Sequence, residues 1–140
     1  MANVTGQLLL TDGMPEASVF ATVASHEVKM RLDWWIEESC MNMDLKTTKS
    51  ISNFVDDFWA YQYDIQVGMF GLIMNSVINK IPSFCIMACE KEEPYATKIF
   101  EISAETMHAS MMKVSSLLFS LQGCVADDIW PYGTEVDGTI

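Results

Sequence analysis

Basic residues are scarce in this sequence. Of its 140 residues only 8 are Lys or Arg, against 19 Asp or Glu, which gives a formal net charge of −11 at pH 7. No Lys or Arg occurs from Val114 to the end. A net negative field repels phosphate groups, so the composition predicts no direct binding of nucleic acid and no docking on anionic membranes. It favours a protein partner with a basic surface.

The usual signatures of catalytic chemistry are also missing. No serine lies in a G-x-S-x-G turn, and no glycine-rich loop is followed by Lys-Ser or Lys-Thr. Glu105 and His108 have the E-x-x-H spacing of carboxylate-bridged metal bundles, but the second pair that such a site needs is absent. Cys85 and Cys89 would share a helical face, yet they lie in an apolar run typical of buried thiols. We therefore predict no enzyme, no cofactor and no metal site.

Signals for secretion or membrane insertion are lacking as well. The start MANVTGQLLL has neither the basic segment nor the cleavage site of a signal peptide. The apolar stretch over 65–89 is interrupted by Asn, Ser and Pro residues, so it is too broken to cross a bilayer. The four cysteines are then expected to be reduced thiols. The predicted location is the cytoplasm, of a cell or of a host.

Apolar residues are abundant, at 50% of the chain, and 11 of them are methionines. A chain of this length with this much core material is expected to form one domain. We divide it into an N-terminal arm (1–14), a helical bundle (15–123) and an acidic tail (124–140).

Three long helices are predicted, over about 15–42, 51–81 and 94–123, with a short segment over 83–93. Pro15 suits the first turn of a helix. From 51 to 65 apolar and polar side chains occupy opposite helical faces, and Ala104 to Leu121 carries apolar residues at alternating spacings of three and four. Gly68 and Gly71 permit close helix contact or a kink, and Gly123 is a natural helix stop. The predicted fold is all-α, an antiparallel bundle of three long helices plus a short one.

One segment also fits another structure. From Val28 to Ile36 apolar and charged residues alternate, which is typical of a strand. On a helix, however, Glu27 with Arg31 and Lys29 with Asp33 form opposite-charge pairs four residues apart. We favour the helix. The alternative is an α+β fold with a strand at 27–37 and further strands at 84–89 and 98–102.

The leading functional hypothesis is a non-enzymatic protein-interaction module. Surplus apolar helix surface without catalytic residues suggests an acidic adaptor or inhibitor, such as a viral or phage accessory protein, that masks a partner surface and forms a homodimer. The candidate interface is Trp34, Trp35, Phe70, Met74, Met107, Met111 and Met112. The candidate acidic surface is Asp127, Asp128, Glu135 and Asp137. The alternatives are a structural subunit of a larger assembly and a metal-binding helical-bundle enzyme.

Overall fold

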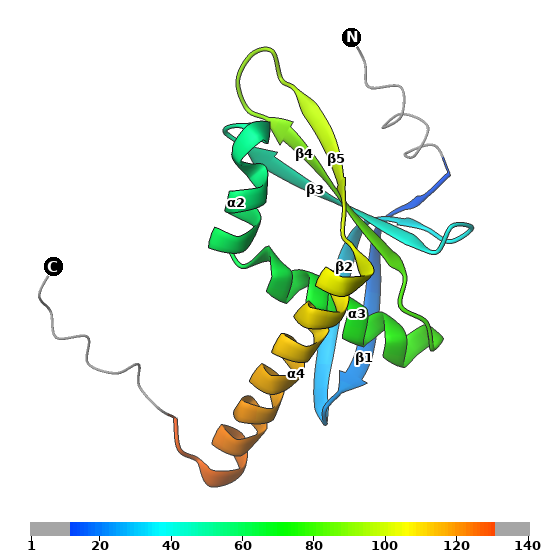
Figure 1. Ribbon diagram of the computed structural model, residues 1–140. Helices are drawn as coiled ribbons and strands as arrows, with labels where there is room; N and C mark the ends of the chain where they lie inside the picture. The colour runs from blue at the N-terminus through cyan, green and yellow to red at the C-terminus, as the bar shows by residue number, and fades with distance from the viewer. Residues whose placement is uncertain (1–11, 131–140) are drawn as a thin grey trace, which may run out of the picture.

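The computed structural model describes residues 12–130, in which a twisted sheet is packed against helices (Figure 1). Its strands are β1 (Met14–Val23), β2 (His26–Ile36), β3 (Met41–Thr48), β4 (Ser83–Glu90) and β5 (Thr97–Glu101). Its helices are the 3-10 turn η1 (Ile51–Asn53), α2 (Phe54–Ala60), α3 (Tyr63–Ile78) and α4 (Ala104–Asp127).

The five strands follow one another across the sheet in chain order. All neighbours are antiparallel except β3 and β4, which are parallel. A parallel pair needs a long crossover, and η1, α2 and α3 supply it. The crossover places α2 and α3 directly after β3.

Helix α3 lies between the sheet and α4, which accounts for its apolar character on every side. Phe70, Met74 and Val67 are buried in a core cluster with Leu32 of β2 and Phe84 of β4. A second cluster joins α3 to α4 and to the end of β1, through Ile73, Val114, Leu118 and Val23.

Two glycines of α3 allow α4 to approach closely, as the sequence predicts. A Cβ atom built on Gly68 would lie 2.3 Å from the backbone oxygen of Ser110. A Cβ atom on Gly71 would lie 2.7 Å from the sulfur of Met111 and 2.8 Å from that of Met107. At Gly68 the nearest atoms belong to the backbone of α4, so this position has no room for a side chain, whereas at Gly71 two methionine side chains would have to move.

The predicted all-α bundle is wrong in both halves of the chain, because β5 lies inside the helix expected over 94–123, which begins only at Ala104. The segment 15–42 is not a helix but the hairpin of β1 and β2, and the next segment is β3. The alternating pattern of 28–36 belongs to strand β2. A strand does lie at each position named in the α+β alternative, as β2, β4 and β5.

The two segregated segments are helical, as predicted. Residues from Ile51 onward form η1, α2 and α3, with a break at Tyr61 and Gln62. The seam from Ala104 lies in α4, but this helix continues past Gly123 to Asp127. Within residues 12–130, no helix combines the length and apolarity needed to cross a membrane.

Candidate functional site

The candidate site lies where β3 loses its pairing with β2. β3 pairs with β4 along its whole length, from Met41 to Thr48. Its pairing with β2 covers only three residue pairs, ending at Trp34 and Met43. The residues that follow at this point are Asp33 on β2 and Asp44 on β3. One edge of β3 is therefore open to side chains from Asp44 onward.

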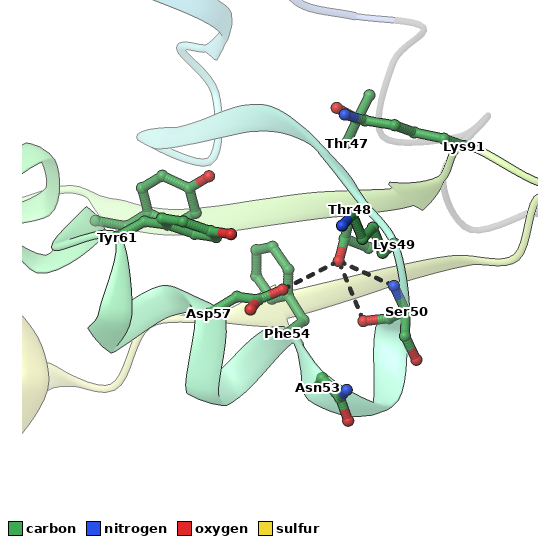
Figure 2. A pocket seen from close by; sticks show the side chains of 10 residues that line it. Thr47, Thr48, Lys49, Ser50, Asn53, Phe54, Asp57, Tyr61 and Lys91 are labelled. Carbon is green, nitrogen blue, oxygen red and sulfur yellow. Dashed lines mark hydrogen bonds between the residues drawn. The ribbon is translucent and has the colours of Figure 1, made fainter.

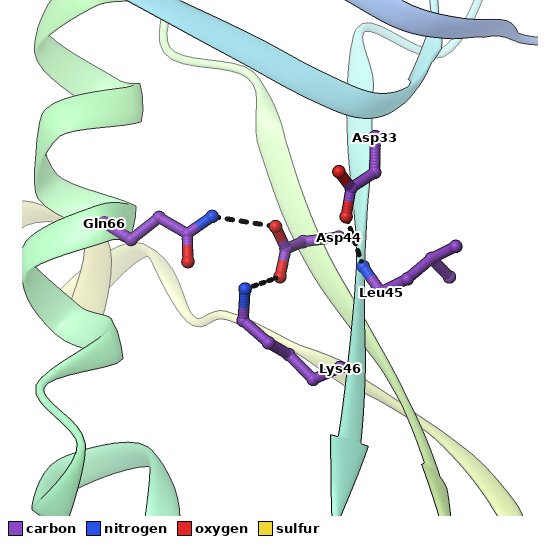
Figure 3. A network of polar contacts seen from close by, with 5 residues as sticks. All are labelled: Asp33, Asp44, Leu45, Lys46 and Gln66. Carbon is purple, nitrogen blue, oxygen red and sulfur yellow. Dashed lines mark hydrogen bonds and ion pairs between the residues drawn. The ribbon is translucent and has the colours of Figure 1, made fainter.

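A polar network occupies this open edge (Figure 3). Asp33 accepts a hydrogen bond through Oδ2 from the backbone N–H of Leu45 at 2.9 Å, in place of a strand partner. Asp44 forms an ion pair through Oδ2 with Nζ of Lys46 at 2.7 Å. Its other oxygen, Oδ1, accepts a hydrogen bond from Nε2 of Gln66 on α3 at 2.8 Å. Two strands and one helix thus bring four polar side chains together.

Burial makes Asp44 the unusual member of this network. The residue is 4% exposed. Burial raises the pKa of its carboxyl above the ordinary value of 3.8, and the nearby Asp33 carboxylate acts in the same direction. Contacts with Lys46 and Gln66 lower the pKa, but they offset the effect of burial only in part. Burial of this carboxylate therefore costs free energy of folding, which an apolar side chain at the same position would not cost.

The raised pKa of Asp44 predicts that the free energy of unfolding depends on pH. Since the folded-state pKa of Asp44 is raised, its contribution to folding is fully present below 3.8 and is lost as pH rises through the folded pKa. Asp44→Asn removes this titration. Measured by denaturant unfolding in chelator, the free energy of unfolding of the variant relative to the wild type should increase from acid pH towards neutrality. A constant difference across that range would contradict the raised pKa.

The site fits a hard divalent cation with part of its coordination shell supplied by the protein. Carboxylate oxygens are preferred ligands of Mg²⁺, which is usually held by one or two carboxylates together with water and substrate phosphates. Asp33 and Asp44 supply two. Among residues 12–130, no group of three or more His, Cys, Asp and Glu side chains is arranged to hold a metal ion. One buried oxygen without a hydrogen-bond partner nevertheless lies two residues before Asp44 on the same strand, Oδ1 of Asn42, whereas Oδ2 of Asp44 is held by Nζ of Lys46.

The residues predicted as an interface are dispersed in the structure. Phe70, Met74 and Met107 are buried in the core, where they hold the sheet and helices together. Met111 is half-buried against Gly71. Met112 is exposed, while Trp34 and Trp35 are half-buried on β2. Formation of a homo-oligomer stays a prediction.

The other candidate residues also lie away from the network. Asp127 and Asp128 are exposed at the end of α4, whereas Glu135 and Asp137 fall outside the described residues. Glu105 and His108 are both exposed on α4. Cys85 and Cys89 lie on strand β4, not on a helix. Burial raises the pKa of the Cys85 thiol, which keeps it protonated.

The four residues of the network were missed in the sequence. Asp33 and Asp44 are eleven positions apart, and only the β2–β3 turn brings them together. Their signal was Asp-Leu-Lys at 44–46, an acidic and a basic residue two apart, which share one face of a strand. That signal disappears when the preceding segment is taken for a helix.

Comparisons with known proteins give a family and a similar fold. A family model described as a PDDEXK-like domain of unknown function (DUF3799) matches residues 2–136. The letters EXK in the family's name, read as residue codes, stand for an acidic residue, any residue and Lys. Asp44-Leu45-Lys46 has the same order. An earlier aspartate, Asp33, is preceded by Leu32 and not by Pro. A search of curated proteins finds no match.

Two solved structures resemble this chain. A crystal structure of a protein from Eubacterium rectale, provisionally named an exonuclease, superposes with a TM-score of 0.77 at 15% sequence identity. The match covers 96% of this chain and 55% of that chain, so the present chain spans about half of its relative's length. The protein SSO0001 is more distant, with a TM-score of 0.48 at 12% identity over 91% of this chain and 65% of that chain. The first likeness shows a shared fold.

These findings correct the functional predictions. A non-enzymatic adaptor, inhibitor or viral accessory protein is contradicted by the PDDEXK-like match and by the fold shared with a provisionally named exonuclease. The expected exclusion of nucleic acid is contradicted on the same grounds. It rested on the net charge of the whole chain, and a net charge does not describe the field at one site.

Proposed function

Because the chain belongs to the PDDEXK-like domain family, we propose that it is a nuclease that hydrolyses phosphodiester bonds with the aid of a divalent cation. The observation that carries this proposal is the meeting of Asp33, Asp44, Lys46 and Gln66 at the open edge of β3. Two carboxylates beside an ammonium group suit a reaction in which a cation and a phosphate are bound together.

Each side chain has a distinct role in this proposal. Asp33 and Asp44 would hold the cation, which supplies polarisation of the phosphate and a more acidic water molecule. Gln66 donates to Oδ1 of Asp44 and so fixes the orientation of that carboxylate. Lys46 neutralises Asp44 through their ion pair. When a cation takes over that task, the ammonium group is available to a phosphate oxygen of the substrate.

We also propose that the protein works in a reducing compartment such as the cytoplasm. Cys40, Cys85, Cys89 and Cys124 all lie in the described part of the chain as unpaired thiols. Thiols persist where glutathione and thioredoxin keep them reduced. This supports the location expected from the sequence.

A direct assay tests the nuclease. The full chain is incubated with end-labelled duplex and single-stranded DNA and RNA, in Mg²⁺, in Mn²⁺ and in chelator. We expect shortened products with a cation and none in chelator. Intact substrates under every condition would refute the proposal, provided that circular dichroism shows folded protein.

A further inference from the structure

A cavity of about 390 Å³ lies at the carboxyl end of β3. Figure 2 shows the side chains that line it. The strand end, helix α2, the start of α3 and the segment after β4 contribute its walls. The backbone N–H of Lys91 donates to the carbonyl oxygen of Thr48 at 3.1 Å, which fixes the segment after β4 next to the end of β3. The volume of the cavity falls within the range of small-molecule sites, roughly 300–1,000 Å³.

The cavity shares a wall with the candidate site. Tyr63, the first residue of α3, lines it. The Nζ atom of Lys46 lies over the ring of Tyr63, 5.1 Å from its centroid. Tyr63 therefore adjoins both the cavity and the lysine that pairs with Asp44.

Basic side chains line the cavity although the chain as a whole is strongly negative. Of the eight basic residues, Lys49 and Lys91 line it, and Lys46 adjoins it. Asp57 is the one carboxylate in the lining, with Oδ2 3.4 Å from the hydroxyl of Thr48. Nearby, Glu90 accepts a hydrogen bond from the backbone N–H of Ile51 at 2.9 Å, so it serves the turn into η1.

An exposed aromatic ring completes the cavity. Tyr61 ends α2, lines the cavity and is 66% exposed. Its ring centroid lies 5.9 Å from that of Tyr63. An aromatic ring held beside basic side chains is the arrangement that binds unpaired bases, because every base has a face that stacks and every nucleotide has a phosphate.

We propose that this cavity binds one unpaired nucleotide of a nucleic-acid strand next to the proposed cleavage site. Its base stacks on Tyr61, and its phosphate lies between Lys49 and Lys91. In a perfect duplex each base is covered by its neighbours, so the cavity favours a single-stranded end over a duplex. The inference rests on the proposed nuclease function for the identity of its ligand, but it concerns binding and not cleavage.

The test measures binding of a short fluorescein-labelled oligothymidylate and of a blunt duplex by anisotropy, in chelator so that no strand is cut. Tyr61→Ala is expected to weaken binding of the oligothymidylate about tenfold, within the range measured for base stacking on aromatic side chains. Tyr61→Phe should retain wild-type affinity, and duplex binding should be unchanged in both variants. Phe20→Ala, which removes another exposed ring, is the matched control without an effect.

The two lysines have their own readout. Lys49→Ala with Lys91→Ala should reduce the salt dependence of oligothymidylate binding, by about 0.7 in the logarithmic slope for each phosphate that the variant fails to neutralise. Lys80→Ala, a basic residue that is exposed and does not line the cavity, should leave the slope unchanged.

The outcomes separate this inference from the nuclease proposal. Unchanged affinity of Tyr61→Ala for the oligothymidylate would overturn the inference even if the protein cuts DNA. An equal loss on single strand and duplex would overturn the preference for an unpaired nucleotide. A selective loss in a protein that cuts neither substrate would support the inference and refute the nuclease.

Discussion

Asp44→Asn is expected to lower the rate of cation-dependent cleavage by about a thousandfold or more. A metal ion contributes several kcal/mol of transition-state stabilisation, and about 1.4 kcal/mol corresponds to a factor of ten in rate. Asparagine keeps an oxygen to accept the hydrogen bond from Gln66, so the local shape is retained. It loses the charge that attracts the cation and pairs with Lys46. The measurement is single-turnover cleavage of a labelled DNA at saturating protein.

The matched control for this result is Asp127→Asn. It makes the same chemical change at an exposed position near the end of α4, and its cleavage rate should equal that of the wild type. Isothermal titration with Mg²⁺ or Mn²⁺ should show weaker cation binding to Asp44→Asn than to the wild type or to Asp127→Asn. Full cleavage by Asp44→Asn would remove this carboxylate from the reaction, and with it the basis of the proposed function.

The hairpin of β1 and β2 shows why the fold was only partly predictable from the sequence. Its turn is Ala24-Ser25, with positive φ angles of 47° and 66°, and Val23 pairs with His26 across it. Two-residue turns of this kind are normally marked by Asn-Gly or Asp-Gly, because those residues tolerate positive φ. Ala-Ser carries no such mark. The turn was therefore invisible, and the two strands were joined into one expected helix.

The charged residues of β2 strengthened that error. Glu27 with Arg31 and Lys29 with Asp33 suit a helix by spacing. In the sheet, Arg31 lies instead 3.7 Å from Glu16 on the neighbouring strand, in a well-exposed pair. Asp33 accepts a hydrogen bond from the backbone N–H of Leu45 on β3. Spacing within one segment does not reveal partners on another strand, so the candidate site was lost together with the sheet.

The helices were predictable because their signal is local. Ile51 to Ile65 and Ala104 to Leu121 carry apolar residues at helical spacing, and both segments contribute to the two core clusters. The close contact of α3 with α4 also had a local sign in Gly68 and Gly71. What a short window of residues determines was recovered, whereas what depends on pairing across the chain was not.

Gly68→Ala is expected to lower the free energy of unfolding by about 3 kcal/mol, near the upper end of the usual cost of overpacking a core. The added Cβ atom would lie 2.3 Å from the backbone oxygen of Ser110 and 2.5 Å from its carbonyl carbon. These are backbone atoms of α4, so no side-chain rotation relieves the clash and the whole helix must move. A loss of this size is a large part of the roughly 5–15 kcal/mol that stabilises a typical domain. Denaturant unfolding monitored by circular dichroism measures it.

Gly123→Ala is the control, because it makes the same change inside the next helix without a clash. Nothing lies within 4 Å of a Cβ atom built at Gly123. There the substitution should raise the free energy of unfolding, by up to about 1 kcal/mol, since alanine favours a helix over glycine. The two variants thus differ in sign although both replace a helical glycine. If Gly68→Ala were as stable as the wild type, α3 and α4 would not pack as closely as described, and the position of Gln66 beside Asp44 would also come into question.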